Sequence, residues 1–257
     1  MRSSGDRREG INSVAVEIRD LWKKFHLYHN KANSLKEKVL FWRQTTVEDF
    51  WALKGINFSI PRGSTLGLVG RNGSGKSTLL KIISRILYPT KGEVRVHGRV
   101  STLLELGAGF HPDFTGRENI FLNASILGLT RKEIKERLGD IIAFSELGSF
   151  IDNPVRNYSS GMYMRLGFAV AVHVDPEILL VDEVLAVGDL AFQEKCLAKI
   201  RELQKRGTTI VFVTHSPKQV QDLCDAAVWL DQGEVRMMGS AKEVTEAYRE
   251  FMEAAAR

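Results

Sequence analysis

The order of apolar and polar residues divides the chain into segments of different kinds. Ile56–Ile60 alternates apolar and polar residues, which is typical of a strand with one face in solvent. Three other short runs are almost continuously apolar, as strands covered on both faces are: Thr65–Val69, Ile178–Val181 and Thr209–Val213. Each is joined to the next by enough residues for a crossover helix. We therefore predict an α/β core whose parallel sheet has helices on both sides.

Between Gly107 and Pro176 the strand pattern gives way to helical spacing. Apolar residues recur three or four positions apart, as at Ile134, Leu138 and Ile141. We therefore expect an all-helical subdomain, at about residues 107–176, inserted into the α/β core.

The segments on either side of the core have other patterns. Residues 1–13 are polar and rich in Gly, Ser and Arg, and we expect them to be disordered. Val14–Ile18 alternates as a strand, and the polar, basic and aromatic segment Lys23–Asp49 is interpreted as an insertion or a surface helix. Near the end, Ala226–Leu230 and Glu234–Met238 flank a Gly-containing turn, which predicts a hairpin, and an amphipathic helix follows.

Composition narrows the class of protein. The chain has 257 residues, of which 44% are apolar, so it can bury a sizeable core. The longest stretch without a charged residue is well short of the roughly 20 residues that a membrane-spanning helix needs. The charged N-terminus lacks the apolar region of a cleaved signal, and Cys196 and Cys224 form no disulfide or zinc pattern. We therefore expect a cytosolic protein. The net charge is +5, and the charged residues are scattered along the chain. We interpret most of them as the solvent-exposed faces of helices.

One motif predicts a phosphate site. Gly70–Ser77 has the spacing G-x-x-x-x-G-K-S, directly after a buried strand and before a predicted helix. Glycines let backbone N–H groups turn toward phosphates, and the helix adds its positive N-terminus. An ordinary Gly-rich turn would need neither the Lys, which reaches the outer phosphates, nor the Ser, which holds Mg²⁺. The predicted ATP-binding residues are Gly70, Asn72, Gly73, Ser74, Gly75, Lys76, Ser77 and Thr78.

Acidic residues follow another buried strand, at the edge where open α/β sheets bind ligands. Asp182 is predicted to hold Mg²⁺ together with Ser77, and Glu183 to orient or deprotonate the water that attacks the γ-phosphate. An apolar strand that ends in Asp-Glu also occurs simply as a capped strand. His215 follows the strand Thr209–Thr214, which right-handed crossovers place beside the phosphate loop. It is either a contact to the γ-phosphate or a structural histidine.

These motifs, with Tyr158–Met162 about twenty residues before Asp182, resemble those of the ATP-binding cassette (ABC) ATPases. The resemblance implies a P-loop NTPase (RecA-like) core with an antiparallel β subdomain and the helical subdomain, over residues 14–257. In that family the signature of one subunit closes over the ATP held by another. Ser159 and Gly161 keep the residue types of the signature, so the resemblance implies a homodimer around two ATP. As a helix N-cap, Ser159 also has an ordinary structural role.

The resemblance assigns three further positions. Asp189 matches the aspartate of the family's D-loop at the dimer seam. Glu105 falls where the family has a glutamine that contacts Mg²⁺ or water, in a register that could be off by one. Phe25 is the best match for the aromatic that stacks on adenine, with Tyr28 and Trp51 as alternatives, although an aromatic there is nearly as often plain core.

A narrower similarity lies in Leu103–Pro112, Thr115–Ile120 and Val184–Asp189. These stretches look like the ATPase subunits of bacterial polysaccharide exporters. That group implies a peripheral subunit on the cytoplasmic face of the inner membrane, a separate permease dimer and a lipid-linked cargo such as O antigen, capsule or wall teichoic acid, with no nucleic acid. Two alternatives remain open: a soluble ABC ATPase that acts on DNA or ribosomes, and a P-loop kinase.

Overall fold

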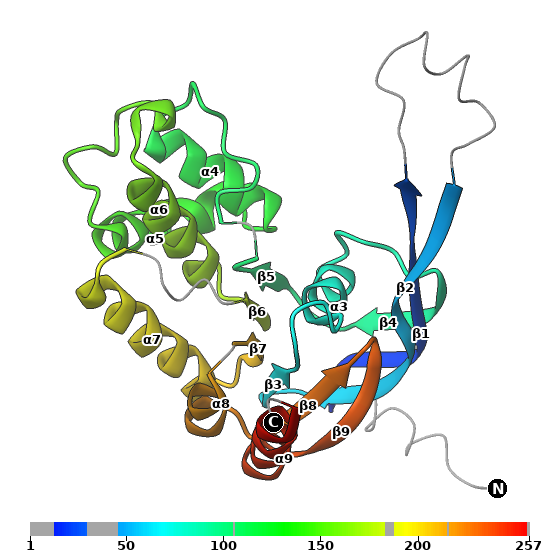
Figure 1. Cartoon of the computed structure of the whole chain (residues 1–257). Coiled ribbons are helices and arrows are strands. Elements are labelled where there is room, and N and C mark those ends of the chain that lie inside the picture. The colour runs from blue at the N-terminus through cyan, green and yellow to red at the C-terminus, as the bar shows by residue number, and fades with distance from the viewer. Residues whose placement is uncertain (1–12, 30–45, 105, 183–187, 215, 256–257) are drawn as a thin grey trace, which may run out of the picture.

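A six-stranded sheet forms the centre of the computed structural model, which describes residues 13–29, 46–104, 106–182, 188–214 and 216–255 (Figure 1). Its strand order is β5–β6–β7–β3–β8–β9, and all neighbours are parallel except β8 and β9. The strands are β3 (Thr65–Val69), β5 (Val100–Thr102), β6 (Ile178–Asp182), β7 (Thr209–Val213), β8 (Ala226–Asp231) and β9 (Glu234–Ser240). The three apolar runs are thus adjacent parallel strands, as predicted.

Both faces of this sheet are covered, because alternate side chains point to opposite sides. On β6, Leu180 packs in a cluster with α3 and the antiparallel sheet, whereas Leu179 and Val181 pack in a cluster with the other helices. The first face therefore carries one helix and a second sheet. The helices are α3 (Lys76–Ile83) on that face and α6 (Ser160–His173), α7 (Leu190–Lys205), α8 (Pro217–Leu223) and α9 (Ala241–Ala255) on the other.

The second sheet has three antiparallel strands, β2 (Thr46–Pro61), β1 (Val14–His29) and β4 (Lys91–Val96), in that order. It corrects one prediction, because 23–29 and 46–49 are paired strand and not a surface helix. Register shifts on either side of Lys23 break the two-residue alternation by which a strand is recognised. Residues 30–45, like 1–12 of the predicted disordered start, lie outside the described residues.

The segment with helical spacing contains α4 (Gly116–Ile126), α5 (Arg131–Ser145), the short 3-10 helix η1 (Val155–Asn157) and α6. We call these four helices the helical lobe. Thr115 and Glu118 form a capping box at the start of α4, and Thr130 and Glu133 form another at the start of α5. The helices share their own apolar cluster, separate from the two clusters on the sheet. The α/β fold with an inserted helical subdomain is thus confirmed.

The predicted hairpin and final helix are also present. Gln232 and Gly233 both have positive φ, at 47° and 86°, which suits the tight turn between β8 and β9. The N–H of Gly233 donates to the carbonyl of Ser74 at 3.1 Å, so this turn touches the phosphate loop. Helix α9 packs on β8, where Trp229 contacts Phe251 with ring centroids 5.1 Å apart. Across the described residues, every helix is too short or too polar to span a bilayer.

Candidate functional site

The phosphate loop joins β3 to α3, and its backbone is shaped by glycine. Gly73 and Gly75 have φ of 79° and 106°, in the left-handed region that other residues rarely adopt. A Cβ on Gly75 would lie 2.7 Å from the carbonyl oxygen of Ala52, so the loop also packs too tightly there for a side chain. Helix α3 begins without a side-chain cap. Its first backbone N–H groups are therefore free of a capping side chain, as an anion site at a helix N-terminus requires.

Lys76 is a buried charged residue of this loop, and only 6% of its surface is exposed. Its ammonium donates to the carbonyls of Gly70, at 2.7 Å, and Arg71, at 2.9 Å. These bonds fold the long side chain back over the loop. A buried ammonium held by backbone carbonyls, beside the uncapped N–H groups at the start of α3, is a fitting site for the outer phosphates of a nucleotide.

Ser77 and Asp182 meet although they are far apart in the sequence. The hydroxyl of Ser77 lies 3.4 Å from a carboxylate oxygen of Asp182. The sheet explains this approach, because β7 separates β3 from β6 and pairs with both, with Val213 facing Leu68 and Asp182. A hydroxyl and a carboxylate oxygen are hard ligands, and Mg²⁺ needs only one or two protein ligands beside water and phosphate oxygens. The pair therefore fits Mg²⁺. Elsewhere in the described residues, no cluster of three or more His, Cys, Asp or Glu could hold a metal ion.

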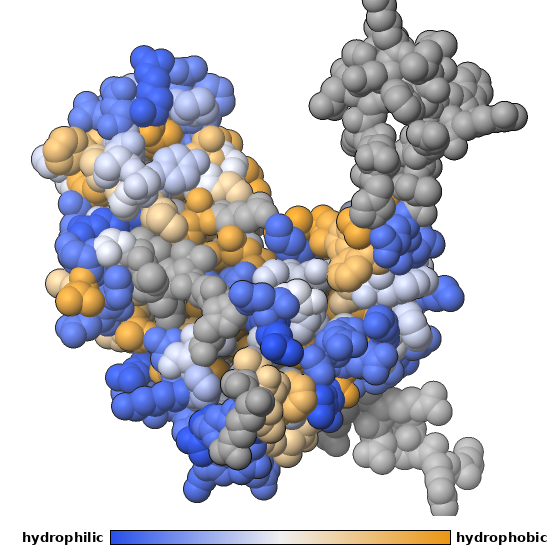
Figure 2. All heavy atoms as spheres, in the orientation of Figure 1, coloured by the Kyte–Doolittle hydropathy of each residue, from blue (hydrophilic) through white to orange (hydrophobic). Residues whose placement is uncertain are grey.

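An aromatic pair faces the loop from the antiparallel sheet. Phe25 of β1 lies opposite Phe50 of β2, and both line a pocket of about 210 Å³ together with loop residues such as Lys76 and Ser77. Figure 2 shows apolar atoms along this strand pair, on the side toward the helices. Phe50 was not predicted, although its cross-strand register with Phe25 would have identified it. Trp51 is not among the pocket residues and packs edge-on against Trp22.

The remaining predicted loop residues lie around the same site. Asn72, Gly73, Gly75 and Thr78 line the aromatic pocket. Ser74 is buried, and its backbone N–H donates to the carbonyl of Arg71 at 3.1 Å. A wider hollow of about 640 Å³ opens on the other side of the loop, toward the turn of the hairpin and Tyr248 of α9.

The predicted signature lies at the start of α6, in the helical lobe and apart from α3 (Figure 1). The hydroxyl of Ser159 accepts the N–H of Met162 at 3.2 Å, so Ser159 caps the helix. A Cβ on Gly161 would have the Ser159 hydroxyl, at 3.9 Å, as its sole neighbour within 4 Å in the described part of the chain. The structure does not bring this stretch to the phosphate loop within one chain.

Asp189 caps the start of α7, and its carboxylate contacts both that helix and α6. One oxygen accepts the N–H of Phe192 at 2.9 Å, and the other pairs with Arg165 of α6 at 2.8 Å. The backbone N–H of Phe192, followed by the nearby Arg165, lowers the pKa of Asp189. The side chain is 66% exposed. Within this chain Asp189 is thus a helix cap and ion-pair partner. The other predicted positions, Glu105, Glu183 and His215, lie outside the described residues.

Comparison with known proteins places the chain in a family. Residues 53–186 match the ABC transporter family, and the chain belongs to it. An O-antigen export system ATP-binding protein of Klebsiella pneumoniae is 46% identical and matches 92% of this chain and 98% of its own length. One of Myxococcus xanthus is 54% identical over 92% of this chain, which spans 56% of that protein. A teichoic acids export ATP-binding protein of Listeria innocua is 44% identical, with 93% of this chain and 71% of its own length covered. The predicted resemblance to this group is confirmed.

Solved structures agree on the fold. The ATP binding subunit of an ABC transporter superposes with a TM-score of 0.72 at 21% identity, covering 91% of this chain and 93% of its own. A dimeric ATP-binding cassette bound to ADP and Pi gives a TM-score of 0.68 at 22% identity, covering 88% and 98%. At this level of identity the similarity establishes the P-loop NTPase fold.

Proposed function

We propose that this chain is the ATP-hydrolysing subunit of a bacterial polysaccharide exporter. Two copies close around two ATP and drive a separate permease dimer that moves a lipid-linked polysaccharide of the O-antigen or teichoic acid type. The observation that carries the proposal is the convergence of the buried Lys76 ammonium, the Ser77 hydroxyl and the Asp182 carboxylate at one edge of the sheet. The names of the export-system relatives support the transported class.

Different residues of the site bind different parts of ATP. Backbone N–H groups of the loop and Lys76 bind the phosphates, while Phe25 and Phe50 hold the adenine between the loop and the strand pair. Ser77 and Asp182 would hold Mg²⁺, which when bound would offset the charge that develops on the γ-phosphate. Glu183 follows Asp182 directly and orients or deprotonates the attacking water, and His215 after β7 contacts the γ-phosphate.

The second copy supplies the other half of the site. Ser159 and the N-terminus of α6 offer a hydroxyl and backbone donors to the γ-phosphate, and Asp189 lies at the seam between the copies. Charge-assisted bonds from both halves favour the closed state, so ATP binding performs the mechanical work. The helical lobe then docks on the permease, which places the subunit on the cytoplasmic face of the inner membrane.

A crosslink tests the shared site. Cysteines at Asn72 and Ser160 are introduced into the Glu183→Gln protein, in which binding without hydrolysis should trap the dimer. The prediction is an ATP- and Mg²⁺-dependent crosslink between two chains, which disappears when Lys76→Ala is added. A monomer that forms no crosslink with ATP would contradict the two-copy mechanism. Co-purification with a permease of several membrane spans, encoded beside glycosyltransferases, tests the export role separately.

A further inference from the structure

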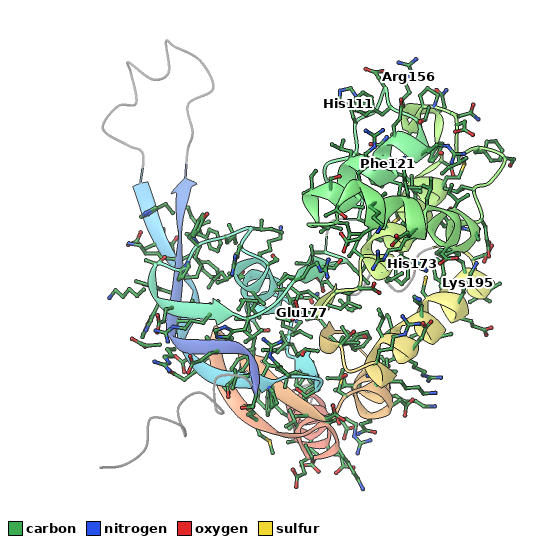
Figure 3. All side chains as sticks on the ribbon, turned by 180° about the vertical axis from the view of Figure 1, so that it is seen from behind. His111, Phe121, Arg156, His173, Glu177 and Lys195 are labelled. Carbon is green, nitrogen blue, oxygen red and sulfur yellow. The ribbon has the colours of Figure 1, made fainter. Side chains whose placement is uncertain are left out.

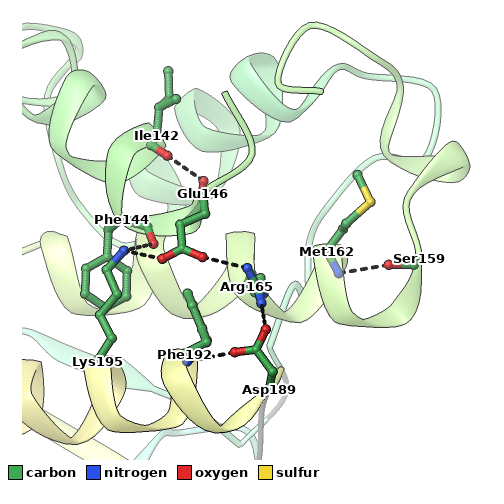
Figure 4. A network of polar contacts seen from close by, with 10 residues as sticks. Ile142, Phe144, Glu146, Ser159, Met162, Arg165, Asp189, Phe192 and Lys195 are labelled. Atoms are coloured by element: carbon green, nitrogen blue, oxygen red, sulfur yellow. Dashed lines mark hydrogen bonds and ion pairs between the residues drawn. The ribbon is translucent and has the colours of Figure 1, made fainter. Parts of the chain in front are cut away.

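A series of ion pairs links α5, the signature helix α6 and α7 (Figure 4). Arg165 of α6 donates one N–H to Glu146 and another to Asp189, each at 2.8 Å. The second carboxylate oxygen of Glu146 accepts from Lys195 of α7 at 2.9 Å. Four charged side chains thus connect the end of α5, the middle of α6 and the start of α7.

The guanidinium at the centre of this series is held from several sides. The Arg165 side chain is 18% exposed, and its guanidinium lies 4.6 Å from the centroid of the Phe192 ring. Its planar fork serves two carboxylates at once, which an ammonium at the same place could not do with the same geometry. Lys195, which extends from α7 toward the helical lobe (Figure 3), also donates to the carbonyl of Phe144 at 3.0 Å and fixes the other side of Glu146.

Glu146 has a backbone conformation that favours glycine over glutamate. It ends α5 with φ 59° and ψ 26°, in the left-handed region where glycine is favoured. Its side chain is 47% exposed, and ion pairs of groups exposed to this extent add little to stability. A glycine would suit this backbone conformation better. The presence of glutamate therefore points to a role for its carboxylate.

We propose that Glu146 is a positioning residue for ATP hydrolysis: it holds Arg165 so that the Asp189 carboxylate keeps the orientation in which it meets the second copy. The inference rests on the proposed function, because Asp189 acts there at the seam of the dimer. Asp189 is 66% exposed, and beside backbone N–H groups of its own helix, such as that of Phe192, its carboxylate contacts Arg165. Arg165 is therefore the contact that connects Asp189 to the helical lobe, and Glu146 is its anchor on α5.

The test compares two substitutions at Glu146 in the full chain. Glu146→Gln removes the charge and keeps the shape, while Glu146→Gly removes the side chain and relieves the backbone. We expect both to leave the KM for ATP unchanged and to lower kcat about tenfold, since a misplacement of about 1 Å can cost up to about a hundredfold in rate and a smaller shift costs less. Glu146→Gly should unfold at the same temperature as the wild type or higher. Lower kcat without lower stability is a result that a merely structural role cannot give.

A matched control removes a comparable acid that does not reach Asp189. Glu202 of α7 pairs with Lys199 and Arg206, so Glu202→Gln should retain wild-type kcat. Arg165→Lys keeps the charge and loses the fork, and combining it with Glu146→Gln should lower kcat no further than one substitution does. A kcat within twofold of wild type for Glu146→Gln, or losses that multiply in the double variant, would overturn the inference.

The same experiment separates this inference from the proposed function. Wild-type hydrolysis that depends on Lys76, with normal kcat in both Glu146 variants, would leave the ATPase in place and remove only the positioning role. If the wild-type chain fails to hydrolyse ATP, the proposed function and the inference fall together. If Glu146→Gly does not fold, the retained shape of Glu146→Gln still decides the outcome.

Discussion

The phosphate loop and the start of α6 both place a glycine at a helix N-terminus, but the surroundings of the two glycines differ. A Cβ on Gly75 would lie 2.7 Å from both the Ala52 carbonyl oxygen and the Leu53 side chain, whereas one on Gly161 would face open space beyond Ser159. The fold of a single chain therefore requires Gly75. It places no such demand on Gly161, so the space beside that glycine is available to a ligand or a second copy. The phosphate loop, which is one half of the proposed site, is thus packed within the chain. The start of α6, which is the other half, is open to a second copy.

The largest expected effect on ATP binding comes from a substitution in the phosphate loop. Lys76→Ala removes a buried cation whose bonds to phosphate are charge-assisted, each worth up to about 3 kcal/mol. Affinity for ATP should fall about a hundredfold, and hydrolysis should disappear. Titration with a fluorescent ATP analogue measures this. Arg71→Ala, on the open side of the loop, is the control, and unchanged affinity in Lys76→Ala would place the phosphates elsewhere.

Gly75→Ala should break the same loop through its backbone. The added methyl group meets the Ala52 carbonyl and the residue is held at φ 106°, so we expect a loss of about 3 kcal/mol in the free energy of unfolding. Chemical denaturation measures that loss. Gly73→Ala shares the positive φ and meets no atom within 4 Å in the described residues, so a smaller loss there isolates the contribution of the contact.

The aromatic pair should account for a smaller share of binding. Stacking on a base is worth about 1–3 kcal/mol, so Phe50→Ala should weaken ATP binding about tenfold and inorganic triphosphate binding hardly at all. Isothermal titration with both ligands measures the difference. Trp51→Ala changes an aromatic outside the pocket and should leave both affinities unchanged. Equal losses for the two ligands in Phe50→Ala would argue against a base-stacking role.

Gly161→Ala gives the smallest effect on the isolated chain, and its sign is opposite. Alanine in a helix is favoured over glycine by about 0.5–1 kcal/mol, and here it meets no close neighbour in the described residues, so thermal unfolding should shift slightly upward. In the Glu183→Gln background, however, the ATP-driven dimer should be lost, as size-exclusion chromatography would show. A variant that still dimerises would mean that Gly161 does not face the second copy.

The sequence predicts the parts of this protein that depend on local pattern. Apolar runs such as Thr65–Val69 identify the covered strands, and the phosphate loop carries its chemistry in consecutive residues. The two-residue alternation fails in β1, where bulges around Lys23 shift the register, and there the strand was read as an insertion or a surface helix. Phe50 was missed for the same reason, because its role depends on a partner in that strand.

Contacts between helices that are distant in the sequence could not be predicted from local pattern. Glu146 is separated from Arg165 by 19 positions and from Lys195 by 49, and no pattern along the chain links them. Their meeting depends on how the end of α5, the middle of α6 and the start of α7 come together. Ser159 was also expected to cap a helix, beside its role in the signature, and within one chain the structure contains the cap.

The hairpin turn behind the phosphate loop has a practical consequence. Gly233 bonds to Ser74, and the wide hollow beside them is shared by Arg71 and by Tyr248 of α9. We therefore expect nucleotide bound in the loop to change the surroundings of Tyr248 indirectly, through Ser74 and the hairpin turn. Because the rings of Tyr248 and Trp229 lie 5.5 Å apart, intrinsic fluorescence should report ATP loading in real time.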